Sequence, residues 1–285
     1  MAASTAVVLD GVPETMLWTL YQRAAEARRP DTVLPDPEAV ALAEAVAGTA
    51  GYPFTERFGH PHPLVAQALA LRAACFDSVV RQFLDAYPEG TVVSLGEGLE
   101  TAFWRCDNGR VSWLTVDLPE PLALRHSLLP HGCSRQHTLA CDARDPAWTK
   151  GIDPARGVLV LAQGLLMYLR PPEVRDLIAN CAEQFPGGGL VFDAVPRTPG
   201  RPADPAARRG PPVARGYRLP PMPWRMNAAE RPRLATAHPG IVEIRGVELP
   251  PGRGLLWAVA APRVERLPVL RNRRPTVTLL RFASR

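Results

Sequence analysis

A regular alternation of short apolar runs with helical patterns, between residues 91 and 193, constrains the fold more than any other feature of this 285-residue chain. The apolar runs lie at 91–95, 111–116, 136–141, 157–162 and 189–193. Short apolar runs that alternate with helices are typical of βαβ units, whose parallel strands are covered by helices on both faces. The alternation therefore predicts an α/β protein built on a mostly parallel sheet.

Helical patterns dominate the chain before the first apolar run. Apolar residues recur at helical spacing in residues 14–27, 36–46 and 63–87. We therefore expect residues 1–88 to form an N-terminal helical segment and residues 89–195 to form the ligand-binding core.

The composition changes after the fifth apolar run. Residues 196–225 contain nine prolines and no pattern typical of a helix or a strand. Long segments of this kind in compact domains are usually functional or disordered. We expect residues 196–239 to form a lid over the substrate, with no regular element before residue 226. Residues 240–285 are predicted to contain two closing strands, at 241–249 and 276–282, and a helix at 254–261.

Small and acidic residues follow the predicted strands. In an open α/β sheet, ligands bind beyond the carboxyl ends of the strands. Gly96 and Gly98 follow the first strand, where they allow the backbone to approach a ligand closely. Asp117 ends the second strand, 19 residues after Gly98, where a carboxylate can accept hydrogen bonds from both ribose hydroxyls. This spacing predicts a nucleoside cofactor.

The same turn argues against a cofactor with a pyrophosphate. Thr101 occupies the place of the third glycine in the dinucleotide-binding motif. Glu97 and Glu100 would repel phosphates at the start of the following helix. S-adenosylmethionine, a common nucleoside cofactor without phosphates, fits better.

Several motifs resemble those of the leucine carboxyl methyltransferase superfamily, and within it the tetracenomycin-type polyketide O-methyltransferases. They are Leu-Gly-Glu-Gly-Leu-Glu-Thr (95–101), Trp-Arg-Cys-Asp-Asn-Gly (104–109), Val-Asp-Leu-Pro-Glu (116–120), Ala-Gln-Gly-Leu-Leu-Met-Tyr-Leu (162–169) and Phe-Pro-Gly-Gly (185–188). Similar segments at 11–15, 220–224 and 278–282 extend the likeness over nearly the whole chain. The resemblance implies a Rossmann-like, seven-stranded methyltransferase sheet with a lid between strands five and six. It also implies S-adenosylmethionine as the cofactor.

The resemblance assigns cofactor-binding roles to particular residues. Arg72 would bind the carboxylate of the cofactor, since a guanidinium matches a carboxylate in two parallel hydrogen bonds. It places Gly96 and Gly98 at the methionine part, Asp117 at the ribose, Asp142 at the adenine amino group and Gln163 near the ammonium. It also counts Glu97, Leu118 and Ala143 among the cofactor-binding residues. Gln163 stands where many relatives have Glu, and Glu100 replaces the usual Asp. Gln163 gives up an ion pair but can still accept a hydrogen bond.

Methyl transfer from a sulfonium is an in-line displacement, so positioning is its main requirement and no catalytic nucleophile or metal is expected. A carboxylate acceptor is already ionised at neutral pH, whereas a phenol or alcohol would profit from a base. His60 and His62 are the only clustered histidines and the only candidates for such a base. The substrate-binding candidates are Tyr21, Tyr168, Met222, Trp224 and Arg225.

The distribution of charge along the chain indicates which kind of molecule the protein binds. Residues 1–195 carry 15 basic and 23 acidic side chains, and residues 196–285 carry 18 and 5, so the second part has a net charge of +13. A positive lid favours an anionic small-molecule acceptor. No nucleic-acid motif accompanies the arginines, and no signal peptide, membrane span or Cys-x-x-Cys pair is recognisable. We expect a cytoplasmic O-methyltransferase. A catalytically impaired cofactor-binding protein and an arginine-rich nucleic-acid binder stay open as alternatives.

Overall fold

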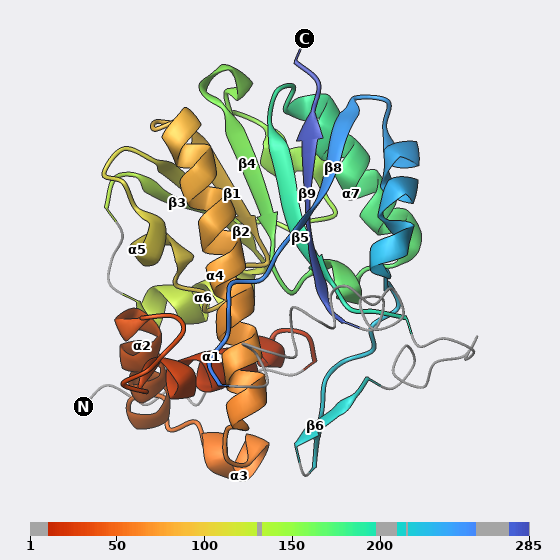
Figure 1. Ribbon diagram of the computed structural model, residues 1–285. Coiled ribbons are helices and arrows are strands. Elements are labelled where there is room, and N and C mark those ends of the chain that lie inside the picture. The colour runs from red at the N-terminus through yellow and green to blue at the C-terminus, as the bar shows by residue number, and fades with distance from the viewer. Residues whose placement is uncertain (1–10, 130–132, 198–209, 215, 255–273, 285) are drawn as a thin grey trace.

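A seven-stranded sheet forms the centre of the molecule (Figure 1). The computed structural model describes residues 11–129, 133–197, 210–214, 216–254 and 274–284. The strands of this sheet are β1 (Thr91–Leu95), β2 (Ser112–Asp117), β3 (Gln136–Ala140), β4 (Val158–Ala162), β5 (Gly189–Ala194), β8 (Ile241–Val247) and β9 (Thr276–Phe282). Their order is β3-β2-β1-β4-β5-β9-β8. Strand β9 runs antiparallel to its neighbours β5 and β8, and the other pairs are parallel. The predicted seven-stranded α/β fold is confirmed.

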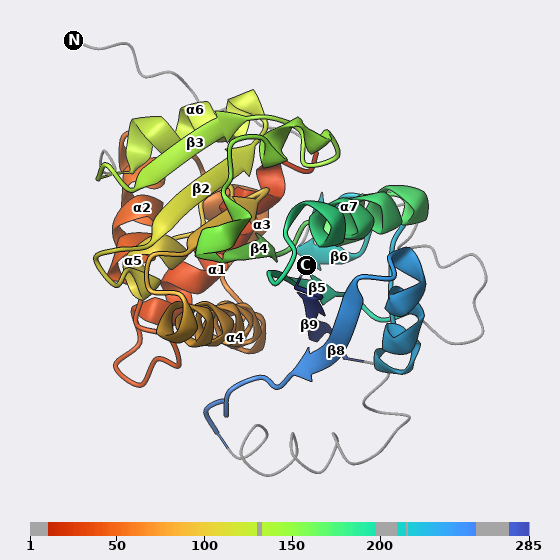
Figure 2. The same cartoon turned by 90° about the horizontal axis from the view of Figure 1, so that it is seen from above.

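Helices cover both faces of the sheet, as its apolar strands require. Helices α4 (Pro63–Ala86) and α5 (Ala102–Cys106) lie on one face, and α7 (Pro171–Gln184) lies on the other (Figure 2). Consecutive residues of β1 illustrate the arrangement: Val92 packs with the α4 side and Val93 with the α7 side, and both are fully buried. Burial on two faces explains why the central strands β1, β4 and β5 read as nearly continuous apolar runs, whereas the edge strands β3 and β8 are largely exposed or half-buried.

Helix α4 is the one helix among the described residues that is long and apolar enough to cross a membrane, judged by length and composition alone. Of its most apolar window, 56% is buried inside the protein. The core helix of a globular domain meets the same criteria, so this finding is weak evidence for a span.

The N-terminal segment packs as a cap at one end of the sheet. It contains α1 (Glu14–Ala27), α2 (Pro37–Gly48) and α3 (Phe54–Phe58), followed by α4. Asp36 begins α2, and its side chain accepts a hydrogen bond from the Ala39 amide, as the sequence Asp-Pro suggests. Helix α6 (Pro119–Leu128), which joins β2 to β3, contacts α2. The five-residue α3 was not predicted, because a single turn leaves no periodic pattern.

The prediction that residues 196–225 have no regular element is wrong. Two short strands, β6 (Pro212–Ala214) and β7 (Tyr217–Arg218), form a hairpin. Gly216 lies in its turn with a φ of +83°, in the region that favours glycine. Strands of two or three residues among prolines are too short to give an alternating pattern. The hairpin is held instead by packing of Tyr217 against Phe58, with ring centroids 4.6 Å apart.

Four 3₁₀ helices complete the described elements: η1 (Pro146–Thr149), η2 (Pro154–Arg156), η3 (Leu166–Tyr168) and η4 (Ala228–Ala237). Strand β8 ends at Val247, two residues before its predicted end. The chain then crosses α4, where the Glu248 carbonyl accepts from the Cys75 thiol. The helix predicted at 254–261 lies outside the described residues beyond Gly254.

Candidate cofactor and acceptor site

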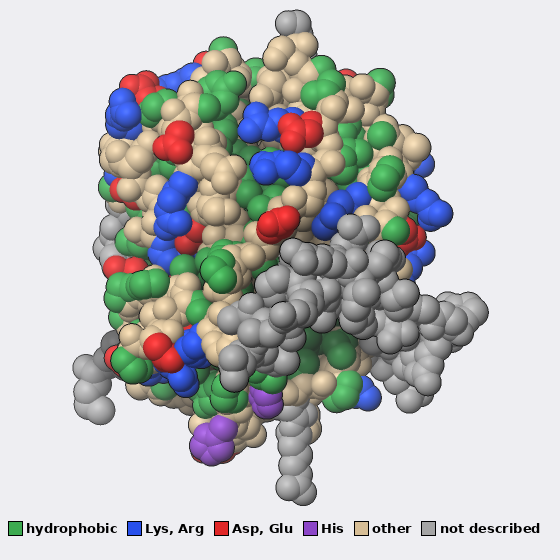
Figure 3. All heavy atoms as spheres, viewed as in Figure 1, with side chains coloured by type: hydrophobic (Ala, Val, Ile, Leu, Met, Phe, Trp, Pro, Cys, Tyr) green, Lys and Arg blue, Asp and Glu red, His purple; other side chains and the backbone are tan. Residues whose placement is uncertain are grey.

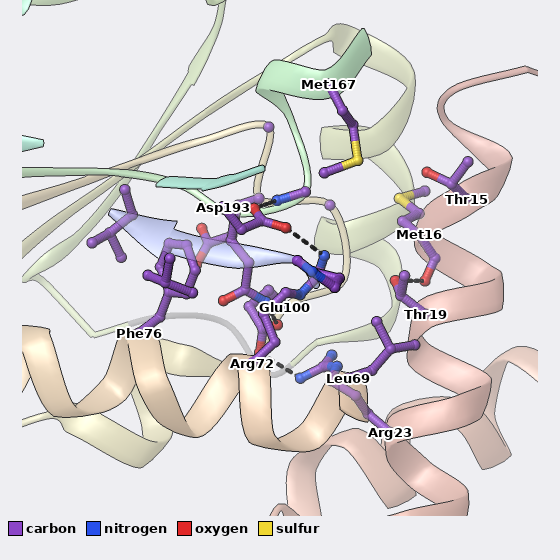
Figure 4. A pocket seen from close by; sticks show the side chains of 18 of the residues that line it. Thr15, Met16, Thr19, Arg23, Leu69, Arg72, Phe76, Glu100, Met167 and Asp193 are labelled. Atoms are coloured by element: carbon purple, nitrogen blue, oxygen red, sulfur yellow. Dashed lines mark hydrogen bonds and ion pairs between the residues drawn. The ribbon is translucent and has the colours of Figure 1, made fainter. Parts of the chain in front are cut away.

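A cavity of about 330 Å³ lies between the cap helices and the carboxyl ends of the central strands. Its described wall comes from α1, α4, the turn after β1, the loop after β4, the end of β5 and the lid around Met222. Figure 4 shows Met16 and Thr19 entering it from α1 and Arg72 entering it from α4. The cavity is thus at the edge of the sheet where open α/β folds bind ligands.

The turn after β1 brings backbone to the wall of this cavity. Gly96 and Gly98 have φ values of +61° and +52°, which side chains other than glycine rarely adopt. A Cβ added at Gly98 would lie 2.9 Å from the Cβ of Met16, so α1 packs directly on the glycine. Close packing and a left-handed backbone together require glycine at position 98.

Glu97, between these glycines, turns its side chain into the protein. Its carboxylate accepts hydrogen bonds from Trp113 Nε1 at 3.1 Å and from the Thr115 hydroxyl, and Arg125 lies 3.5 Å away. Burial raises the pKa of Glu97 above its ordinary value, against the opposing effect of Arg125. The Glu97 carboxylate therefore anchors the turn to β2 through Trp113 and Thr115.

Asp117 fixes the turn from the neighbouring strand. Its Oδ2 accepts from the Gly98 amide at 2.7 Å and its Oδ1 from the Leu118 amide at 2.8 Å. Burial raises the pKa of this carboxyl, although both amides favour the ionised form. Asp117 and Leu118 lie beside the turn, outside the residues that enclose the cavity. The predicted ribose contact therefore requires a ligand that extends from the cavity across Gly98.

The structure does not bring Asp142 or Ala143 to the cavity. Both oxygens of Asp142 are engaged by the guanidinium of Arg144, at distances from 2.5 to 3.1 Å, and Arg144 lowers the pKa of this carboxyl. The Ala143 carbonyl accepts from Trp148 Nε1 at 3.1 Å. The predicted roles of Asp142 at the adenine and of Ala143 at the cofactor stay predictions.

Arg72 reaches the cavity and pairs there with Asp193 at the end of β5. Its Nη1 donates to Asp193 Oδ2 at 3.1 Å, and the Gly164 amide donates to Asp193 Oδ1 at 2.5 Å. Among the described residues, the buried Nε of Arg72 has no hydrogen-bond partner. The sequence analysis did not identify Asp193 as a site residue. The pattern that identified Asp117, an acidic residue at the end of a predicted strand, is also present at Asp193.

A buried ion-pair network behind the turn was also missed. Arg23 of α1 pairs with Asp36 at 3.0 Å and with Glu100, and Arg105 of α5 pairs with Asp36, Asp77 and Glu100 at 2.7 to 2.9 Å. Burial opposes ionisation of Glu100, but the two arginines outweigh it and lower its pKa to about 2. No local sequence motif predicts these ion pairs, because most of the paired residues lie in separate elements.

Gln163 lies on the cavity wall with Glu100. Its Nε2 donates to Glu100 Oε2 at 2.7 Å. The two residues at which the resemblance implies a departure, Glu100 and Gln163, are therefore in direct contact.

Of the substrate-binding candidates, Tyr168 and Met222 line the cavity. Burial raises the pKa of Tyr168 to about 12. Tyr21 instead stacks on Phe54, with centroids 4.8 Å apart, and Trp224 packs on Phe192 in the sheet core.

Arg225 and the histidines also lie apart from the cavity wall. The carbonyl of Arg225 accepts from Arg197 Nε at 2.9 Å, outside the enclosing residues. His60 and His62 are exposed in the link between α3 and α4. The structure thus places neither histidine where it could reach an acceptor inside the cavity.

Comparison with known proteins identifies the family of this chain. A family model for leucine carboxyl methyltransferase matches residues 16–182. The tetracenomycin polyketide synthesis O-methyltransferase TcmP of Streptomyces glaucescens is 30% identical over 188 residues, which cover 66% of this chain and 67% of TcmP. The S-adenosyl-L-methionine-dependent methyltransferase dpfgK of Gibberella zeae is 29% identical over 203 residues, with coverage of 66% and 67%.

A solved structure supports the fold. The crystal structure of a candidate methyltransferase from Thermobifida fusca YX aligns with a TM-score of 0.50 and 18% identity, over 92% of this chain and 94% of that one. The sheet order and the glycine turn, with these relatives, define an S-adenosylmethionine-dependent methyltransferase of class I fold. Within that class, the chain belongs to the leucine carboxyl methyltransferase family.

The cavity fits S-adenosylmethionine on its own chemistry. Arg72 offers a carboxylate its buried Nε, which has no hydrogen-bond partner among the described residues, and the turn at Gly96 and Gly98 brings backbone to the cavity wall. Asp117 accepts directly from the Gly98 amide of the turn and from the Leu118 amide, so both of its oxygens are held in place. These residues would hold the amino-acid and ribose parts of the cofactor.

Proposed function

We propose that this methyltransferase acts on an oxygen of a small, largely apolar molecule, and that this oxygen belongs to a carboxylate. The observation that carries the proposal is that the described part of the cavity wall offers no base for a hydroxyl. Tyr168, with a pKa raised to about 12, is protonated at neutral pH. Asp193 is already engaged by Arg72 and by the Gly164 amide, and Asp77 is held by Arg105. Glu97 accepts from Trp113 and Thr115, and Glu100, with a pKa lowered to about 2, is too weak a base for a hydroxyl. A carboxylate, with a pKa near 4, needs no base.

Bound S-adenosylmethionine supplies a methyl group on a positively charged sulfur. The chain itself has to exclude water and to align the acceptor with that methyl group. Well-oriented reactants can gain about 7–11 kcal/mol from such positioning. Met16, Met167 and Met222 present flexible apolar surface to the acceptor, and the protonated Tyr168 hydroxyl can donate a hydrogen bond to it.

The described wall of the cavity does not have the strong positive charge of residues 196–285, whose net charge is +13. Its described cations are Arg23, Arg72 and Arg274, and its described carboxylates are Asp77, Glu97, Glu100 and Asp193. On the face shown in Figure 3, Lys and Arg side chains are intermixed with Asp and Glu. These features support recognition of a small ligand more than of a polyanion such as nucleic acid.

The test uses S-adenosylmethionine with a labelled methyl group and pairs of acceptors that share one aromatic skeleton, one acid and one phenol in each pair. A methyl ester releases its label as methanol in mild base, whereas a methyl ether does not. We expect base-labile product from the acids, with a kcat/KM that is flat from about pH 6 to 8. His60→Ala and His62→Ala should leave the rate unchanged. Base-stable product, formed with a rate that rises steeply with pH, would establish a hydroxyl acceptor instead.

A further inference from the structure

The network behind the glycine turn carries more negative than positive charge. It joins three carboxylates, Asp36, Asp77 and Glu100, to two guanidiniums, Arg23 and Arg105. Every one of these side chains is at most 12% exposed. Water therefore screens these charges poorly, and the excess negative charge of the network acts on groups inside the protein.

Among the residues that the structure describes, one further cation, Arg81, approaches the network from solvent. Arg81 lies 3.7 Å from Asp77, but its side chain is 55% exposed. Such an exposed pair contributes little because solvent screens it. About one net negative charge therefore remains in the network.

Glu100 is the group through which this charge reaches the cavity. Among the described carboxylates of the wall, Asp77 is held by Arg105 through both oxygens, Glu97 faces Arg125, and Asp193 faces Arg72. By contrast, Oε2 of Glu100 receives its hydrogen bond from the neutral amide of Gln163. Its other oxygen binds the arginines, so among the described residues the oxygen that accepts from Gln163 has no cationic partner.

We propose that Glu100, together with Gln163, binds the α-ammonium of the cofactor's methionine part. The amino-acid end of the cofactor carries an ammonium beside a carboxylate, and the cavity presents Glu100 and Arg72 as groups of opposite charge (Figure 4). Gln163 adds a neutral amide oxygen and holds the carboxylate in place. The charge expected from sequence at position 163 is thus supplied from position 100.

The first experiment measures binding by calorimetry with two ligands. S-adenosylhomocysteine contains the ammonium, whereas 5′-deoxy-5′-methylthioadenosine keeps the adenosine and thioether but lacks the amino-acid end. Glu100→Gln should weaken binding of S-adenosylhomocysteine about 10- to 100-fold and change binding of methylthioadenosine less than about twofold. An equal loss for both ligands, or no loss for either, would overturn the proposal.

A charge exchange and a matched control sharpen the result. The double variant Glu100→Gln with Gln163→Glu moves the carboxylate across the 2.7 Å hydrogen bond and should regain most of the lost affinity. Asp36→Asn disturbs the same arginines but does not line the cavity, so it should lower the melting temperature and leave the affinity unchanged. If Asp36→Asn reproduces the ligand-specific loss, Glu100 acts only through the fold.

A second variant covers the case in which Glu100→Gln does not fold. Glu100→Asp keeps the charge for the arginines but withdraws it by one methylene from the cavity. It should show the same loss for S-adenosylhomocysteine alone, and wild-type affinity would refute the assignment. Because neither ligand is a methyl acceptor, failure here leaves the proposed carboxylate specificity untouched.

Discussion

Asp117 shows how a single carboxylate can prepare a binding site before any ligand arrives. It holds the Gly98 amide at 2.7 Å and the Leu118 amide at 2.8 Å, which sets both the turn and the start of the segment after β2. Each oxygen retains a further lone pair that a ribose hydroxyl can use. The same residue therefore orients the backbone and offers the predicted contact.

Asp117→Ala should weaken binding of S-adenosylhomocysteine about 10- to 100-fold, because truncation removes the ribose acceptor and releases the Gly98 amide. Calorimetry on folded protein measures the change. Asp107→Ala is the matched control, since Asp107 pairs with Arg135 away from the cavity wall and should leave affinity unchanged. Wild-type affinity in the Asp117 variant would remove this residue from the ribose role.

At the scale of elements, the sequence predicts what local pattern encodes. The strands of the sheet, and α1, α2 and α4, were predicted close to their observed bounds. Buried strands appear in the sequence as short apolar runs, and helices with one buried face appear as a period of apolar residues. The β6–β7 hairpin was not predicted, because it depends on Tyr217 packing against Phe58 far away in the chain.

The candidate site divides in the same way. Gly96, Gly98 and Asp117 could be found because the ends of parallel strands meet at one edge. The ion pair between Arg23 and Glu100 could not be predicted, because the sequence of an arginine-rich chain does not indicate which guanidinium pairs with which carboxylate. Such contacts follow only from the packing of α1 on the turn.

Gly98→Ala tests that packing directly. Alanine at this position is strained by the φ of +52°, and its Cβ would lie 2.9 Å from the Cβ of Met16. Gly109→Ala is a matched control, because Gly109 has a φ of +78° but no atom within 4 Å of the added Cβ. Both variants should lose about 1–2 kcal/mol to backbone strain.

Gly98→Ala should lose a further 1–3 kcal/mol, roughly, to overpacking against α1. Thermal unfolding should show the difference as an additional fall of several degrees in Tm. Equal falls for the two glycine variants would mean that α1 moves away from the turn without cost.

At the scale of the whole molecule, segments from both ends of the chain close the cavity. After β8 the chain crosses α4 toward α1 (Figure 1). Arg253 there pairs with Glu26 of α1 through two hydrogen bonds of 2.5 and 3.0 Å, and Leu249 lines the cavity. The cap, the lid and this crossing segment together enclose the cavity. The ion pairs between them are therefore expected to stabilise the fold as a whole.

The buried ion pairs of Glu100 predict how stability responds to acid. Glu100 has a pKa of about 2 in the folded protein and an ordinary value of 4.5. A carboxyl whose folded pKa is depressed stabilises the fold fully above its unfolded pKa, and the contribution is lost as the pH falls toward the folded pKa. Glu97 and Asp117, whose pKa values are raised, act in the opposite direction and oppose part of this loss.

The free energy of unfolding should therefore fall between about pH 4.5 and pH 2, and Glu100 should contribute about 3 kcal/mol to the fall. Urea unfolding at a series of pH values gives the slope for the wild type and for Glu100→Gln. The variant should be less stable at pH 7, because Arg23 and Arg105 lose a charged partner, and should lose less stability on acidification. Parallel curves for the two proteins would show that the ionisation of Glu100 is not linked to folding, and that other carboxylates determine the acid sensitivity.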